Sequence, residues 1–162
     1  NSSSCFKRCC FSQKSSPPSP QKRQHQSKAQ PMQIKIYYED TDAQGIVYHA
    51  NYIKFCERAR SEALMQAGVD FARADAHFVV SELCAKFLRP ARLGDTLEIH
   101  TSLAALKNAS ALLRQEIYKI KDIKNVDFSE LLYVQDVKIA FVKDGRPIKF
   151  SAEILEFFKS LR

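Results

Sequence analysis

The stretch NYIKFCERARSEALMQA, residues 51–67, has the clearest secondary-structure pattern in the chain. Its apolar residues recur at the three- and four-residue spacing that places side chains on one face of an α-helix. This apolar face consists of Tyr52, Phe55, Cys56, Ala59, Ala63, Leu64 and Ala67. Asn51 is a suitable N-cap, and Gly68 follows where helices commonly end on a left-handed residue. The pattern therefore predicts one long helix whose apolar face must be buried.

The segments on both sides of this helix alternate between polar and apolar residues, as strands do. We expect strands at residues 33–39, 78–88, 96–106, 109–120 and 130–142, a turn at Asp144-Gly145, and a closing helix at 152–161. The expected inward faces are Val79, Leu83, Ala85 and Phe87 in the second strand and Leu131, Tyr133, Val137, Ile139 and Phe141 in the last. Long successive strands with short links favour an antiparallel sheet. The sequence therefore predicts an α+β domain in which an antiparallel sheet wraps around one long central helix.

Charge divides the chain into two parts. The whole chain has 25 basic and 18 acidic residues, a net charge of +7. Residues 1–30 contain six of the basic residues and no acid, so the rest of the chain is nearly neutral. The first part is also rich in Ser and Pro and poor in apolar residues, and such segments do not bury enough surface to fold. We therefore expect a disordered basic extension over residues 1–31 and one folded domain over 32–162.

The composition also argues against several functional classes. A nearly neutral domain gives no case for a nucleic-acid binder, and no window approaches the roughly 18 apolar residues of a membrane-spanning helix. The extension is similar to an organelle transit peptide in being basic, Ser-rich and free of acids, and its charge would equally suit a membrane surface or nucleic acid. Cys56 and Cys84 form no C-x-x-C pair, so we expect reduced thiols in a cytoplasmic protein.

The segment Asp40-Thr41-Asp42-Ala43-Gln44-Gly45 begins like a calcium-binding loop. An EF-hand needs oxygen ligands at its first, third and fifth positions and a bidentate Glu at its twelfth. Here the fifth position is Gln44 and the twelfth is Asn51, so the required carboxylate is missing. No metal site is therefore expected.

Asp42 has a second interpretation, as a carboxylate held near the start of the long helix. A helix N-terminus has unpaired N–H groups and about half a positive charge, which keep a nearby carboxylate ionised. The same N–H groups polarise an acyl carbonyl and stabilise the oxyanion that forms on attack. Gly45 allows the chain to turn, and Ile46, Val47 and Tyr48 supply an apolar lining. This combination suits acyl transfer, although position alone fits a turn or N-cap aspartate equally well.

The same segment resembles the signature of a known enzyme family. Residues 38–52, YEDTDAQGIVYHANY, followed by Glu57-Arg58-Ala59-Arg60, are similar to YbgC-type acyl-CoA thioesterases, which are related to 4-hydroxybenzoyl-CoA thioesterase. The similarity continues through Phe78-Val79-Val80 and through PARLGDTLEI at residues 90–99, and it covers about residues 33–145. The resemblance implies a hotdog fold, hydrolysis of an acyl-CoA or, as a second candidate, an acyl carrier protein thioester, and no metal or organic cofactor.

The resemblance also implies roles for single residues. The catalytic carboxylate would be Asp42, and the backbone N–H that binds the carbonyl oxygen would be that of His49. The implied substrate contacts are Gly45, Val47, Tyr48 and Asn51. Family members are dimers with the active site at the subunit interface and often form tetramers, so a homodimer or homotetramer is implied. Gln44 and Phe87 depart from the family pattern, and Phe87 would alter the acyl pocket.

Other polar residues of the region have structural interpretations. Asp40 is expected to orient the loop, and Glu57 to pair with Arg60 one helical turn later. The His49 ring either fills the pocket or hydrogen bonds to the substrate. A basic cluster fits either the phosphates of coenzyme A or a solvated edge, and its members are Lys86, Arg89 and Arg92.

Alternatives remain for the function and for the mechanism. One is a non-catalytic hotdog module that binds acyl-CoA or acyl carrier protein. Another is a hotdog dehydratase, whose arrangement of a His and an acid on different elements the motif does not match. If the chain is a thioesterase, Asp42 acts either as a nucleophile that gives a mixed anhydride or as a general base that activates water. The sequence does not separate these two routes.

Overall fold

The structure is a computed structural model that describes residues 31–70 and 75–162. Its elements are β1 (Met32–Lys35), the 3-10 helix η1 (Tyr38–Asp40), α2 (His49–Gln66), β2 (Ala76–Phe87), β3 (Thr96–Leu106), β4 (Ser110–Lys121), β5 (Asp127–Lys143), β6 (Arg146–Pro147) and α3 (Ala152–Ser160). The four strands predicted after the long helix, and the closing helix, agree with β2 to β5 and α3 to within three residues at each end. The predicted extension lies, up to residue 30, outside the described residues.

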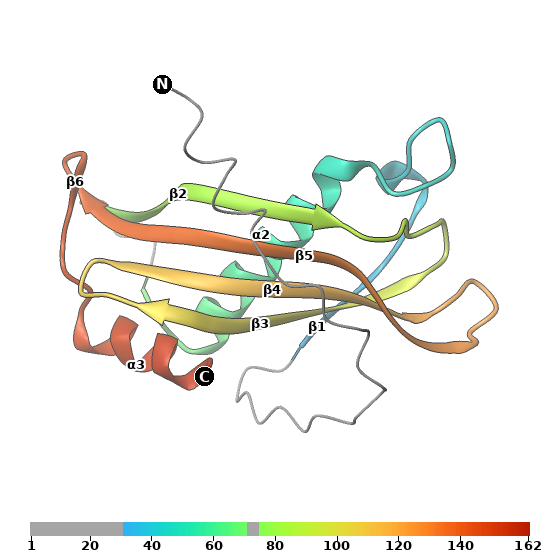
Figure 1. Cartoon of the computed structure of the whole chain (residues 1–162). Coiled ribbons are helices and arrows are strands. Elements are labelled where there is room, and N and C mark those ends of the chain that lie inside the picture. Colours follow the sequence, from blue (N-terminus) through green and yellow to red (C-terminus); the bar gives the residue numbers. More distant parts are fainter. Residues whose placement is uncertain (1–30, 71–74) are drawn as a thin grey trace, which may run out of the picture.

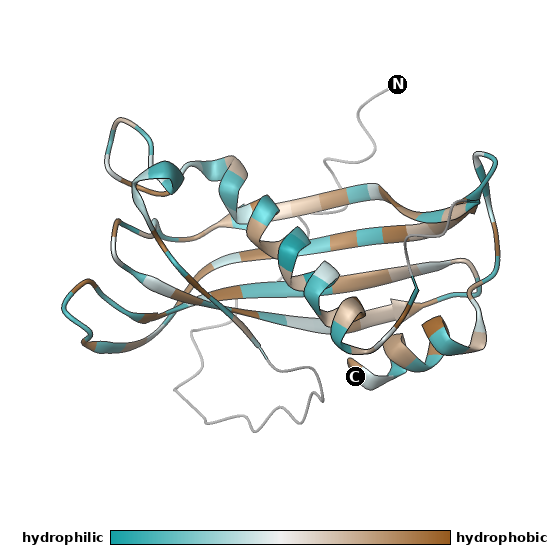
Figure 2. Cartoon of the chain, turned by 180° about the vertical axis from the view of Figure 1, so that it is seen from behind, coloured by the Kyte–Doolittle hydropathy of each residue, from teal (hydrophilic) through white to brown (hydrophobic). Residues whose placement is uncertain are grey.

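One antiparallel sheet forms the body of the fold. Its strand order is β1-β3-β4-β5-β2, and the short β6 pairs with β5. The long helix α2 lies across one face of the sheet, and α3 packs on the same face near the end of α2 (Figures 1 and 2). Hydrophilic residues dominate the side of α2 that points away from the sheet in Figure 2. This arrangement confirms the predicted α+β hotdog fold.

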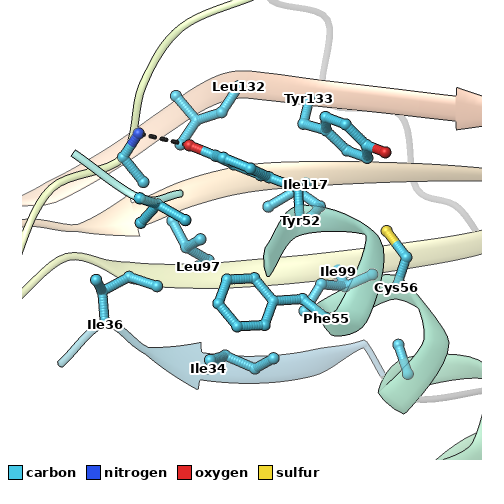
Figure 3. Packing of buried hydrophobic residues seen from close by; sticks show 13 residues of the cluster. Ile34, Ile36, Tyr52, Phe55, Cys56, Leu97, Ile99, Ile117, Leu132 and Tyr133 are labelled. Atoms are coloured by element: carbon cyan, nitrogen blue, oxygen red, sulfur yellow. Dashed lines mark hydrogen bonds between the residues drawn. The ribbon is translucent and has the colours of Figure 1, made fainter. Parts of the chain in front are cut away.

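Most of the predicted apolar face of the helix is buried, in two clusters, but the predicted Ala67 is exposed and follows the last residue of α2. The first half of α2 contributes Tyr52, Phe55 and Cys56 to a cluster with residues of β1, β3, β4 and β5 (Figure 3). The second half contributes Leu64 to a cluster that surrounds α3, whose Phe158 is fully buried. Complete burial of such a side chain stabilises the fold by roughly 1.5–3 kcal/mol. Burial of this face therefore fixes α2 against the sheet.

A β-bulge between Val80 and Glu82 makes one predicted inward position wrong. Ser81 is the extra residue there, and it inverts the alternation of side chains along β2. Val79 consequently lies on the opposite face from Leu83. The inward face is formed instead by Phe78, Val80, Leu83, Ala85 and Phe87, each of which pairs with an inward residue of β5.

A second irregularity corrects the inward face of β5. Ile117 pairs with Tyr133 and Tyr118 pairs with Leu131, which leaves Leu132 as an extra residue. Leu132 is fully buried, whereas the predicted Leu131 is only half-buried. The remaining predicted inward residues of this strand are buried.

The first predicted strand is too long. The observed strand β1 ends at Lys35, and residues 38–40 form η1 instead. The Asp40 carboxylate accepts a hydrogen bond from the Tyr37 N–H (2.9 Å), which offers the backbone a turn in place of a strand ladder.

A buried polar network joins α2 to the middle of the sheet. The Arg60 guanidinium donates to Gln115 Oε1 (2.5 Å) and pairs with Glu57, as the sequence predicts. Gln115 Nε2 in turn donates to the Cys56 carbonyl oxygen (3.0 Å), and Gln135 Nε2 donates to Gln115 Oε1 (2.9 Å). No buried side-chain nitrogen or oxygen lacks a partner in the part of the chain that is described. The network therefore holds α2 in register without an unpaired buried charge.

Replacement of Gly94 by Ala tests the turn that leads into β3. Gly94 has a φ of 82°, and an added Cβ would lie 2.5 Å from Ile123 Cγ1. Gly68 has a φ of 70° but open space around it, so Gly68→Ala is the matched control. We expect Gly68→Ala to cost about 1–2 kcal/mol of left-handed strain, and Gly94→Ala to cost a further 1–3 kcal/mol of overpacking. Urea unfolding of both variants measures this difference, and equal losses would contradict the described packing.

Candidate active site

The loop between η1 and α2 is closed by backbone hydrogen bonds. The Asp42 N–H donates to the Ile46 carbonyl oxygen (2.9 Å), and the Gly45 N–H donates to that of Asp42 (2.9 Å). Gly45 has a φ of 72°, which an L side chain rarely adopts. An antiparallel bridge between Thr41 and Val47 joins the ends of the loop. Asp42 is thus held beside the short segment that leads into α2.

The Asp42 carboxylate is half-buried and only partly used by the loop. Its Oδ1 accepts a hydrogen bond from the Gln44 N–H (2.8 Å), as in an Asx-turn. Its Oδ2 has no hydrogen-bond or ion-pair partner among residues 31–70 and 75–162. One carboxylate oxygen therefore remains available for chemistry.

Asp40 orients the loop, as predicted, because its carboxylate accepts the hydrogen bond from the Tyr37 N–H. The backbone of Asp40 contributes as well. Its carbonyl oxygen accepts hydrogen bonds from the Tyr48 N–H (2.9 Å) and from Asn51 Nδ2 (2.9 Å). The prediction of Asn51 as N-cap is wrong, because α2 begins at His49 and its N-cap residue is Tyr48. Asn51 is buried inside the first turn, where its amide ties the helix to the loop. Both contacts fix the loop relative to the first turn of α2.

His49 is the first residue of α2. Its N–H donates to no acceptor in the described part of the chain, as expected for the first N–H groups of a helix. Its ring is exposed and lies 4.4 Å from the Tyr48 ring and 6.4 Å edge-on from the Phe87 ring, centroid to centroid. The site therefore presents an unpaired N–H at the positive end of the helix dipole, next to aromatic surface.

The other predicted substrate contacts differ in exposure. Gly45 is exposed, and the Tyr48 side chain is about half exposed, at 46%. Val47 is 3% exposed and belongs to the first core cluster, so its side chain lies beneath the loop. Asn51 is 8% exposed. Gly45 and Tyr48 are therefore at the surface of the site, and Val47 and Asn51 are under it.

One hydrogen bond that supports the site was not predicted from the sequence. The Ala91 N–H donates to the Tyr52 hydroxyl (2.8 Å), as the dashed line in Figure 3 shows. Burial raises the pKa of Tyr52, so this phenol stays neutral. Because the Val47 N–H donates to the Ala91 carbonyl oxygen (2.9 Å), Ala91 links α2 to the end of the loop that contains Asp42. The sequence showed the family motif at residues 90–99, but no local pattern predicts a contact between Tyr52 and Ala91, which are 39 residues apart.

The predicted basic cluster does not form one continuous group of free charges. Arg89 pairs with Glu130, whereas Lys86 and Arg92 are exposed and have no ion-pair partner among the described residues. No helix in the described ranges is long and apolar enough to cross a membrane.

Comparison with known proteins identifies the family. The model of the thioesterase superfamily matches residues 44–125. The acyl-CoA thioesterase YbgC of Helicobacter pylori is 40% identical over 131 residues, which are 80% of this chain and 97% of that relative. The chain therefore belongs to the thioesterase superfamily, and it is a thioester hydrolase.

Solved structures agree with this assignment. A probable thioesterase from Bartonella henselae is 31% identical, covers 75% of this chain and 96% of its own, and has a TM-score of 0.63. A 1,4-dihydroxy-2-naphthoyl-CoA thioesterase from Synechocystis has a TM-score of 0.72 over 82% of this chain and 96% of its own, at 16% identity. The second likeness concerns the fold alone.

Tyr52→Phe tests the link between α2 and Ala91. Ala91 is fully buried, so loss of the hydroxyl leaves its N–H without an acceptor. We expect a loss of roughly 1–3 kcal/mol in the free energy of unfolding. The control is Tyr118→Phe, because the Tyr118 hydroxyl donates to the Glu116 carboxylate (3.1 Å) at a half-buried site where water replaces it. Chemical denaturation that ranks the two losses in the opposite order would refute the proposed link.

Proposed function

We propose that the chain hydrolyses acyl-CoA thioesters to a free acid and coenzyme A, with Asp42 as the catalytic carboxylate and the His49 N–H as the donor to the thioester carbonyl oxygen. The observation that supports this most strongly is the free Asp42 Oδ2 in a loop tied to the first turn of α2, whose first N–H is also unpaired. The name of the Helicobacter pylori relative supports the acyl-CoA substrate.

Two routes use this arrangement. In the first, Asp42 Oδ2 attacks the carbonyl carbon and forms a tetrahedral oxyanion. The carbon–sulfur bond of this intermediate then breaks, the thiolate leaves, and water hydrolyses the mixed anhydride that remains on Asp42. In the second, a water molecule attacks the same carbon while Asp42 removes one of its protons. Asp42 then passes this proton to the leaving thiolate. In both, charge develops on the carbonyl oxygen, and the His49 N–H stabilises it together with the helix dipole.

The surrounding residues have supporting roles in this proposal. Tyr48 and the His49 ring form an aromatic wall for the acyl group, and Gly45 lets the substrate approach the loop. Val47 and Asn51 are buried beneath the loop and hold it in place, so they support the site without contacting the substrate. Cys56 is excluded as a nucleophile, since burial raises the pKa of its thiol to about 12.

The proposed assembly is a homodimer or homotetramer with active sites at the subunit interface. β2 is the last strand in the sheet order, and its 12 residues have no strand on their outer side among the described residues. Long unpaired edges invite pairing with another chain. A second copy of β2 would extend the sheet across the subunit interface. Acyl carrier protein thioesters remain the second candidate substrate.

Asp42→Asn is the direct test of the proposed function. The amide keeps the size of the side chain and its Asx-turn acceptor, but it is neither a nucleophile nor a base. We expect kcat/KM for an acyl-CoA to fall at least about 100-fold, because such groups contribute 10²–10⁴-fold to the rate.

The matched control is Asp122→Asn. Asp122 Oδ1 accepts a hydrogen bond from the Lys124 N–H (2.8 Å) two residues later, the same local geometry as at Asp42, but in the loop between β4 and β5. This variant should keep the parent kcat/KM. The rate of hydrolysis is measured from the release of the CoA thiol. An Asp42→Asn enzyme with unchanged kcat/KM would disprove the assignment, and tight acyl-CoA binding with no turnover by the parent would favour a non-catalytic binding module.

A further inference from the structure

A stripe of apolar side chains runs along β2 on the side that faces α2. The bulge at Ser81 brings Phe78 and Val80 onto the same face as Leu83 and Phe87, so the stripe is continuous along the strand. One end of the stripe lies at the active site, because the Phe87 ring is 6.4 Å from that of His49. Val80 is 49% exposed and Phe87 is 52% exposed, so the stripe is incompletely covered.

The other end of this stripe opens into a cavity of about 330 Å³. Its walls come from the second half of α2, the first half of β2 and the inward faces of β3, β4 and β5, and α3 closes it. The apolar lining includes Leu64, Phe78, Val80, Leu113, Phe157 and Leu161. A cavity of this size and lining suits an apolar ligand or an apolar part of one.

Polar side chains line the part of the cavity next to α2. Among them are Glu57, Arg60, Ser61 and Thr101. Arg60 is 7% exposed, but its charge is neutralised by Glu57 and its guanidinium also donates to Gln115. No unpaired charge therefore faces the cavity from Arg60, and an uncharged chain could enter without leaving a buried charge unpaired.

The direction of α2 connects the cavity to the proposed reaction centre. At about 100° per residue, His49, Arg60 and Leu64 fall within one narrow sector of the helix. Glu57, at the near edge of the cavity, is eight residues beyond His49, or about 12 Å along the axis. An extended chain advances roughly 1.2 Å per bond, since three backbone bonds span about 3.6 Å. A linear acyl group of roughly ten bonds would therefore reach the cavity from a carbonyl bound at His49.

We infer that the cavity holds the distal part of a linear acyl chain, which lies along the seam between α2 and β2, and that α3 sets the upper limit of its length. This inference rests on the proposed function, because the acyl group must be bound with its carbonyl at His49. It makes the substrate class more specific: linear acyl thioesters of about ten carbons or more. Each methylene buried in the seam and cavity raises kcat/KM about fourfold, until Phe157 and Leu161 stop the chain.

Val80→Trp tests this inference. Val80 is half exposed on the stripe, so an indole there fills the mouth of the cavity without disturbing the core. The measured quantity is the ratio of kcat/KM for dodecanoyl-CoA to that for butanoyl-CoA, below micelle-forming concentrations. We expect this ratio to fall at least tenfold. Val126→Trp is the matched control, because Val126 is 52% exposed in the loop between β4 and β5 and does not line the cavity. Its ratio should equal that of the parent.

A second variant tests the role of α3. Phe157→Ala shortens one wall of the cavity, and the chain length of maximal kcat/KM should increase by at least two carbons. Thermal unfolding shows whether this variant is folded. If it is not folded, Val80→Trp alone decides the inference. An unchanged length profile in folded Phe157→Ala would overturn the role of α3.

The outcomes separate this inference from the proposed function. If Asp42→Asn abolishes turnover but Val80→Trp keeps the parent ratio, the proposed function stands and the cavity does not hold the acyl chain. If the parent hydrolyses no acyl-CoA, displacement of 1-anilinonaphthalene-8-sulfonate by dodecanoate tests the cavity directly. If dodecanoate displaces the probe from the parent but not from Val80→Trp, the result supports an acyl site in the cavity. Equal displacement from both proteins overturns the inference. A change in sedimentation of Val80→Trp, with an unchanged ratio, would show that a second copy of the chain covers the cavity.

Discussion

The first turn of α2 is held in place by the carbonyl oxygen of Asp40. That oxygen accepts one hydrogen bond from the backbone of Tyr48 and another from the side chain of Asn51. Tyr52, one residue further, is held by the buried N–H of Ala91. Because the loop with Asp42 lies between these anchors, its position follows from the position of the helix. The rest of the fold maintains this arrangement by burying the apolar face of α2 against the sheet.

In the proposed function, this geometry lets a short loop serve as the reaction centre. An aspartate in a turn uses one oxygen for its own loop, and at Asp42 the second oxygen is left without a partner. The adjacent helix start supplies an N–H and a fixed positive dipole, neither of which needs to reorganise when charge develops on a substrate oxygen. The aromatic rings of Tyr48, His49 and Phe87 flank this polar pair. A carboxylate, a donor and apolar surface are thus available in one place.

Sequence periodicity predicted the regular helices and strands, but it missed the β-bulges and the long-range contacts. The apolar face of α2, apart from Ala67, and the bounds of β3 were predicted correctly, because buried helices and strands impose regular spacing. Val79 was assigned to the wrong face, because a bulge adds one residue and no local pattern shows where the partner strand fails to match it. Asn51 was misassigned as the N-cap, since its true acceptor, the Asp40 carbonyl, is eleven residues away. The contact between Tyr52 and Ala91 was missed for the same reason, whereas the structural role of Asp40 and the pairing of Glu57 with Arg60 were visible as short-range patterns.

The most direct measurement of the central claim is a crystal structure of the Asp42→Asn variant with an intact acyl-CoA bound. The account predicts the thioester carbonyl oxygen at hydrogen-bond distance, about 2.7–3.1 Å, from the His49 nitrogen, with the residue 42 amide facing the carbonyl carbon or a water molecule beside it. An acyl-CoA bound with its carbonyl away from the start of α2, or with residue 42 on the far side of the loop, would contradict it.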